Sequence, residues 1–192
     1  QQLLQGLTKS YYKTPGSVTA ALRSNAENLN QYMLDRNMRG SSRGVRAVGA
    51  LTQVVVRRDT IYFAQSGLCH LFVLKNDRAV EFHDPKLSGR GLGVSRVPRV
   101  RYHQEKLEPN DHYLITAAPP PVWTTGTLRN ISRMPLKGKY QRLIHRVEED
   151  MEAGLLFFRK GQGTIRMITP VEKEGMGSGD VLDPDVEEDP GE

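Results

Sequence analysis

The sequence predicts an α+β fold in which helices flank antiparallel sheets. Apolar residues recur at helical spacing in the first forty positions and then change to the alternation typical of strands. The strand-like segments are short and separated by tight turns, which favours antiparallel pairing over parallel crossovers. One more helical segment and a last pair of strand-like segments follow, so helices fall on both sides of the strands in chain order.

Two helices are expected before the first strand. Residues 3–13 look like the end of a helix, and the breaker Thr14-Pro15-Gly16 ends it. Ser17 is a suitable N-cap for a second helix that ends near Asn37. The apolar residues of this helix recur at helical spacing: Val18, Ala21, Leu22, Leu29, Tyr32 and Met33. A basic, glycine-rich loop is expected at 39–46.

The remaining elements follow from alternation and turn residues. Strands are expected at 47–56, 60–65, 71–75, 79–82, 100–105, 111–116, 154–159 and 164–171. Turns at 57–59, 76–77 and 160–163 predict three hairpins. A helix is expected at 139–151, with Leu143, Ile144 and Val147 on its apolar face.

Size and composition indicate one domain with a tail. The chain has 192 residues, of which 38% are hydrophobic, enough for a core. No apolar run approaches the roughly 18 residues of a membrane span, and no signal segment opens the sequence. Gln1-Gln2-Leu3-Leu4 opens as if within a helix, so we expect a fragment of a longer protein. The single Cys69 excludes an internal disulfide and fits a reducing, cytoplasmic location.

The charge distribution sets the domain boundary. Residues 172–192 hold nine acidic residues and one lysine, whereas residues 1–171 hold 26 basic and 13 acidic residues. We therefore expect a domain at 1–171 and an acidic, solvated linker or free end at 172–192. The alternative is that the tail masks the basic body. In either case, a membrane anchor beyond the tail in the parent protein is compatible with the sequence.

Several short motifs in order resemble the metal-dependent serine/threonine phosphatases of type 2C (PPM). They are Ser24 to Asn30, Val48 to Thr52, Ala64 to His70, Gly91-Leu92-Gly93 and Leu107 to Pro119. The resemblance covers about residues 17–170, and the Gly89 to Gly93 segment is similar to divergent bacterial members. It implies a layered sandwich of antiparallel sheets flanked by helices, N-terminally truncated here because the first strands would precede Gln1.

The departures from the family pattern concern its carboxylates. The resemblance places the late metal-ligand aspartate at Ala118 and its glycine at Pro119. The aspartate of the family's Gly-Asp-Ser-Arg, which is not the main metal ligand, falls at Leu68. The chain has neither Asp-Gly nor Asp-Asn. Because Mg²⁺ and Mn²⁺ need oxygen ligands, we expect no catalytic residue, no metal and no cofactor.

Other residues offer no replacement for these ligands. The histidines are scattered in sequence: His70, His83, His103, His112 and His145. His83-Asp84 precedes a proline and is interpreted as a turn. Cys69 and His70 should point to opposite faces of a strand, so a buried structural cysteine is expected.

Two irregular segments are interpreted structurally. The glycine-rich 89–93 lacks the lysine and serine of a phosphate loop, so we expect a flexible connection, with phosphate cradling as the remote alternative. The segment 119–123, Pro-Pro-Pro-Val-Trp, should stiffen a loop and cover the core, and docking to a proline-reading domain is the alternative.

The basic residues supply the candidate contacts. Arginines cluster at 36–46 and at 96–101, and guanidinium groups match phosphate and carboxylate. The candidate anion or partner contacts are Arg39, Arg43, Arg46, Arg96 and Arg99. Solvated surface arginines are the plainer interpretation.

Three functions are compatible with these features. The first is a catalytically inactive phosphatase-like domain for protein–protein recognition or signalling, with a partner that carries phosphorylated segments or with self-association through a sheet edge. The second is a residual Mn- or Mg-dependent phosphoprotein phosphatase. The third is a basic nucleic-acid-binding domain, for which the sequence contains no known motif.

Overall fold

The computed structural model describes residues 2–40, 44, 46–145, 147–148 and 150–158. Its helices are α1 (Gln2–Lys13), α2 (Val18–Gly40), α3 (Pro85–Ser88), the 3-10 helix η2 (Ile131–Arg133) and α4 (Leu136–Ile144). Its strands are β1 (Leu51–Arg57), β2 (Thr60–Ser66), β3 (His70–Lys75), β4 (Arg78–Phe82), β5 (Arg101–Lys106), β6 (His112–Thr116) and β7 (Ala153–Phe157).

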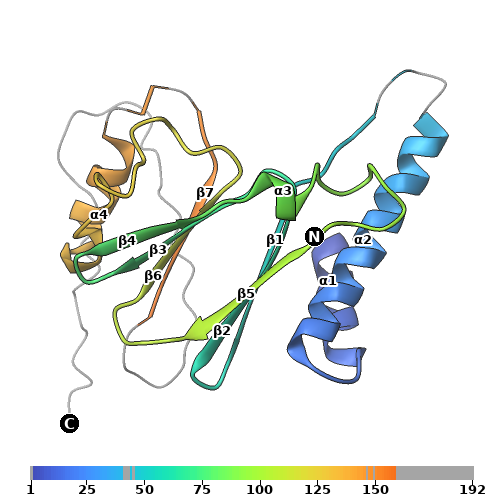
Figure 1. The fold of residues 1–192 in the computed structure, drawn as a ribbon, viewed down its shortest axis with the longest axis horizontal. Coiled ribbons are helices and arrows are strands. Elements are labelled where there is room, and N and C mark those ends of the chain that lie inside the picture. The colour runs from blue at the N-terminus through green and yellow to red at the C-terminus, as the bar shows by residue number, and fades with distance from the viewer. Residues whose placement is uncertain (1, 41–43, 45, 146, 149, 159–192) are drawn as a thin grey trace, which may run out of the picture.

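The strands form two antiparallel sheets that lie between helices. The first sheet has the order β1-β2-β5 and the second has the order β4-β3-β6-β7. In Figure 1 the helix pair α1 and α2 lies beyond the first sheet, and α4 lies beyond the second. The expected α+β class with antiparallel sheets and flanking helices is therefore confirmed.

Three groups of buried side chains hold these layers together. Val18 and Leu22 of α2 pack on Ala64 of the first sheet. Ile61, Phe63, Leu71, Val73 and Tyr113 fill the space between the two sheets. The third group joins the second sheet to the α4 region: Phe72, Leu74, Leu114, Trp123, Leu128, Ile131 and Leu143. The fold therefore has three layers of buried side chains: one between α2 and the first sheet, one between the two sheets, and one between the second sheet and the α4 region.

Local signals placed most elements correctly. The Ser17 hydroxyl accepts a hydrogen bond of 3.1 Å from the Ala20 amide, as its N-cap role requires. Arg58 and Asn76 have positive φ angles of 57° and 49° in the two expected hairpin turns. The short helices α3 and η2 were not expected.

The predicted bounds of two elements were wrong. The helix expected at 139–151 instead spans Leu136–Ile144, because Pro135 precedes its first turn and the indole Nε1 of Trp123 bonds the Leu143 carbonyl at 2.8 Å. The first strand begins at Leu51 rather than at 47, because the backbone of Ala47 bonds to the side chain of Asn37.

Only the first strand of the predicted C-terminal hairpin lies within the described residues. β7 pairs with β6, with Leu114 opposite Leu155. The strand expected at 164–171 and the acidic tail lie outside the described residues. Among the described helices, none is long and apolar enough to cross a membrane.

Candidate functional site

Leu68 and Ala118 lie at the same end of the second sheet. Leu68 precedes β3 and Ala118 follows β6, and the two strands are antiparallel neighbours with His70 opposite Thr116. Leu68 is 61% exposed, and the amide of Ala118 donates to the Thr116 hydroxyl at 3.3 Å. The fold therefore brings together two positions that are far apart in sequence, and neither side chain offers an oxygen ligand.

Closely packed glycine backbones form the floor of this region. The Gly67 amide donates to the Ser88 carbonyl at 2.9 Å, and Gly49 exchanges two hydrogen bonds of 3.1 and 2.8 Å with Leu92. Gly91 has a φ of +107°, and a Cβ there would lie 2.6 Å from the Gly49 carbonyl oxygen. The expectation that 89–93 is a flexible connection was wrong, because these contacts fix its backbone and bury Leu92 completely.

Two asparagines of α2 hold the loop that follows. The Asn30 amide donates to the carbonyls of residues 95 and 96 at 2.9 and 3.2 Å, and its oxygen accepts from the Gly93 amide at 2.8 Å. The Asn37 amide donates to the Ala47 and Gly93 carbonyls at 2.7 and 2.9 Å. Sequence reasoning missed these contacts, although the asparagine-rich stretch of the helix was a signal for them.

Two of the histidines expected to be scattered lie together in the structure. The rings of His70 and His83 stack with 3.7 Å between their centroids and 7° between their planes. His70 Nδ1 lies 2.7 Å from the Glu81 carboxylate, and His83 Nδ1 lies 3.1 Å from the Cys69 carbonyl. The β3–β4 register creates this arrangement. Within the described part of the chain, no group of three or more His, Cys, Asp or Glu residues could hold a metal ion.

The structure places three further side chains that the sequence singled out. Cys69 is buried, as expected, and its thiol lies 3.3 Å from the Leu51 carbonyl. The turn expected at His83-Asp84 is instead the start of α3, where Asp84 has an extended backbone and its carboxylate caps the helix by accepting from the amides of residues 86 and 87 at 3.0 and 3.1 Å. Trp123, at the end of the proline segment, is buried in the core beside α4.

The first group of candidate arginines lies at the end of α2. Arg39 is exposed on the last turn, where its Nε donates to the Asp35 carbonyl at 3.3 Å. Arg46 is also exposed and donates to the Val94 carbonyl at 2.8 Å. Arg43 lies outside the described residues.

The second group is divided between two places. Arg96 is exposed on the loop whose carbonyls Asn30 binds. Arg99 donates to the Lys86 carbonyl at 3.2 Å and packs over Gly89, beside α3. The fold therefore brings Arg96 to the same loop that Arg46 contacts, while Arg99 lies apart.

A polar network joins the two sheets at the opposite end of β3. The Tyr113 hydroxyl donates to Glu105 at 2.8 Å, and it lies 3.4 Å from Asp111. Lys75 Nζ lies 3.2 Å from Asp111 and 3.6 Å from Glu105. His103 Nε2 lies 3.7 Å from the other Glu105 oxygen. Sequence reasoning missed this network, whose signal was the alternation of polar residues along β5.

The groups of this network change one another's pKa values. Burial raises the pKa of Glu105, but the nearby ring of His103, the hydrogen bond from Tyr113 and the charge of Lys75 outweigh it, so the pKa is lowered. Burial lowers the pKa of Lys75, but Asp111 and Glu105 outweigh it, so the pKa is raised. Burial and then the bond to Glu105 raise the pKa of Tyr113, so this phenol stays a donor.

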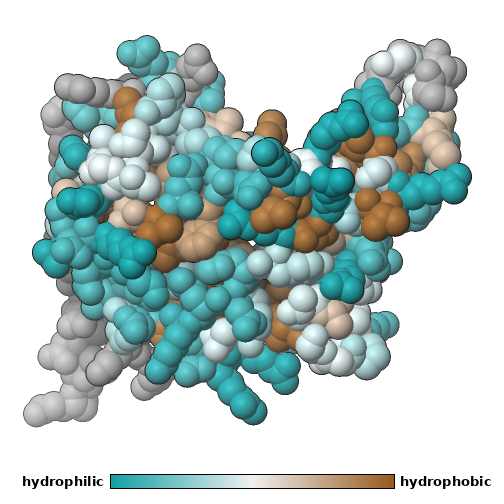
Figure 2. Space-filling model, viewed as in Figure 1, coloured by the Kyte–Doolittle hydropathy of each residue, from teal (hydrophilic) through white to brown (hydrophobic). Residues whose placement is uncertain are grey.

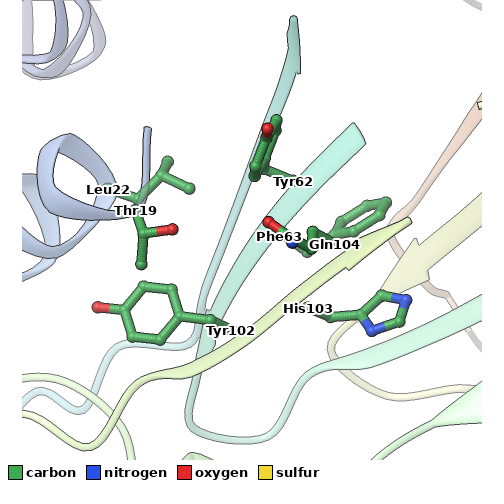
Figure 3. Close-up of a pocket in the computed structure, with 7 residues that line it drawn as sticks. All are labelled: Thr19, Leu22, Tyr62, Phe63, Tyr102, His103 and Gln104. Atoms are coloured by element: carbon green, nitrogen blue, oxygen red, sulfur yellow. The ribbon is translucent and has the colours of Figure 1, made fainter. Parts of the chain in front are cut away.

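A separate cavity of 220 Å³ lies between α2 and the first sheet. Figure 3 shows Thr19 and Leu22 on one side and Tyr62 and Tyr102 of the sheet on the other, with His103 pointing away. Among the residues that line it there is no carboxylate and no lysine, and neither Leu68 nor Ala118 belongs to its lining.

Comparisons with known proteins identify the fold. No family model matches the chain, and no curated protein sequence matches it. The S. agalactiae serine/threonine phosphatase is 14% identical, with a TM-score of 0.61, over 81% of this chain and 79% of that chain. The chain has the fold of the type 2C serine/threonine phosphatases.

Two further structures support the same fold. PppA, a key regulatory component of T6SS in Pseudomonas aeruginosa, is 14% identical, with a TM-score of 0.60, over 80% of this chain and 77% of that chain. The catalytic domain of the serine/threonine protein phosphatase PstP, in complex with 2 manganese ions, is 16% identical, with a TM-score of 0.56, over 75% of this chain and 71% of that chain.

The resemblance implies a metal-ligand aspartate at Ala118, and the side chain present there does not fit that role. Divalent ions of this kind take oxygen ligands, mainly carboxylates. Ala118 has only a methyl group and is followed by Pro119, and Leu68 at the same sheet end is also apolar.

Proposed function

We propose that this chain is a catalytically inactive phosphatase-like domain that acts in protein–protein recognition. The observation that carries the proposal is the apolar pair Leu68 and Ala118 at the end of the second sheet, two positions at which the resemblance to the type 2C pattern implies aspartates. A methyl group at Ala118 cannot help to neutralise a divalent cation, whereas the backbone frame around it is kept.

Exposed apolar side chains around the same region support a binding role. Val48, Leu68 and Leu87 are 56%, 61% and 57% exposed. Two contacts bring them together. Val48 packs on Gly91. Gly67, which precedes Leu68, donates a hydrogen bond to Ser88, which follows Leu87. Figure 2 shows apolar residues exposed among hydrophilic ones on the face of the molecule that it draws. Exposed apolar groups rimmed by polar residues are typical of protein-binding surfaces.

The candidate arginines define the partner we propose. Arg39, Arg46 and Arg96 are exposed around the end of α2 and its neighbouring loop, and Arg99 lies beside α3. Guanidinium groups bind phosphate through two parallel hydrogen bonds, so a phosphorylated protein segment fits this surface. PppA, described above as a regulatory component, has the same fold, and we propose for this chain a regulatory role through binding, in the cytoplasm.

Self-association is the second interaction we propose. β1 is an edge strand of the three-stranded sheet and contains Val54, Val55 and Val56 with its only charge at Arg57. An edge strand of this kind is a template for pairing with another strand. Sedimentation velocity of the chain, with Val55→Lys as the disrupted variant, tests this interaction, and a monomer at high concentration would exclude it.

Calorimetric titration of the purified chain with MnCl₂ tests the proposed inactivity. We expect no heat beyond dilution and no phosphate release from a phosphoserine peptide with or without Mn²⁺. Micromolar binding together with Mn²⁺-stimulated phosphate release would overturn the proposal and restore the metal-dependent phosphatase. A chelator-treated sample is the matched control.

A further inference from the structure

Two buried hydrogen-bond donors lie side by side between the sheets. Gln65 of β2 is directly opposite Arg101 of β5. Gln65 is 2% exposed, and both its Nε2 and the Nη1 of Arg101 are buried without a hydrogen-bond partner among the residues that the structure describes. Side chains opposite each other in an antiparallel pair lie on the same face with Cβ atoms about 5 Å apart, so one ligand can reach both.

These two side chains face the second sheet. Phe63, two positions before Gln65 on β2, belongs to the core between the sheets. The Arg101 guanidinium carbon lies 5.7 Å from the ring centre of Phe82 on β4, in the second sheet. Figure 3 shows His103, which shares this face of β5, pointing away from α2. Arg101 is only half-buried, so solvent reaches part of its side chain.

The charge of Arg101 has no carboxylate partner among the described residues. Glu105 lies on the same face of β5, but four residues of strand separate their Cα atoms by about 13 Å. Glu105 already contacts Lys75 and Tyr113. A buried donor or charge without a partner is destabilising, and an acceptor that completes it stabilises the protein.

We propose that Arg101 and Gln65 form a binding site for an oxyanion, either a phosphate group or a carboxylate. The planar guanidinium can donate two parallel hydrogen bonds to such a group, and the Gln65 amide adds another. This inference goes beyond the proposed function, because it needs neither an inactive metal site nor the exposed arginines around α2.

Calorimetric titration with sodium phosphate and, separately, sodium acetate at constant ionic strength tests the site. The variant Arg101→Met keeps an unbranched stem against Phe82 and removes the donors. The matched control is Arg78→Met, which removes the same charge from an exposed position on β4 that has no part in the proposed binding surfaces. We expect the intact chain and Arg78→Met to bind equally, and Arg101→Met to bind roughly tenfold to hundredfold more weakly. Binding of phosphate would identify the ligand as a phosphate group, and binding of acetate would identify it as a carboxylate.

Gln65→Glu provides a second test that does not depend on a loss of packing. Its carboxylate should accept from Arg101 within the protein, so melting temperature should rise without added anion and respond less to phosphate. The proposal is overturned if neither anion binds the intact chain, since water would then satisfy both donors. It is also overturned if Arg101→Met binds as tightly as the control. Neither outcome bears on the Mn²⁺ titration.

Discussion

Replacing Gly91 by alanine tests whether the close backbone packing beneath the candidate site is essential. The new Cβ would lie 2.6 Å from the Gly49 carbonyl oxygen and 3.1 Å from a methyl group of Val48. The φ of +107° is itself unfavourable for alanine by about 1–3 kcal/mol. Relieving the overlap would also disturb the two hydrogen bonds between Gly49 and Leu92, each worth about 1 kcal/mol.

These contributions predict a loss of about 3–5 kcal/mol in the free energy of unfolding. For a domain of this size the melting temperature should fall by roughly 10 °C. Urea denaturation followed by circular dichroism measures the change. The control is Gly6→Ala in α1, where nothing lies within 4 Å of the added Cβ. It should stabilise the helix by up to about 1 kcal/mol. A loss below about 1 kcal/mol for Gly91→Ala would refute the packing argument.

Three further changes are predicted. Asn30→Ala removes three hydrogen bonds and should lower unfolding free energy by about 2–3 kcal/mol, with faster proteolysis of the loop between α3 and β5. Trp123→Phe loses the bond to the Leu143 carbonyl and should cost about 1 kcal/mol by urea denaturation, and no change would contradict the role of the indole. The folded-state pKa of Glu105 is lowered, because hydrogen bonds and Lys75 outweigh burial. Its carboxylate therefore stabilises the fold above the unfolded pKa of about 4.3, and this stability is lost as pH falls through the folded pKa. Between pH 6 and pH 3, Glu105→Gln should lose less unfolding free energy than the intact chain, and equal losses would contradict the argument.

Contacts between residues close in sequence were predictable. The cap at Ser17 and the turns at Arg58 and Asn76 depend on residues within a few positions, and the structure has them where expected. The order of weak motifs likewise predicted the type 2C phosphatase fold, and the fold comparison agrees with that prediction.

Contacts between distant residues were not predictable in the same way. The helix α4 ends where it does partly because Trp123, twenty positions before Leu143, bonds its carbonyl. The stacking of His70 on His83 depends on the register of β3 and β4.

The sequence by itself determined the order of the strands β1 to β7 and of the helices α1, α2 and α4 around them. Only the tertiary structure decided that Gln65 and Arg101 face each other without an acceptor among the described residues, and that glycine backbones fix the 89–93 segment. The physical reason is that caps, turns and alternation act over a few residues. Strand register and the close packing of two backbones instead depend on segments that are far apart in the sequence. The local residue pattern of either segment does not indicate that the two will be neighbours in space.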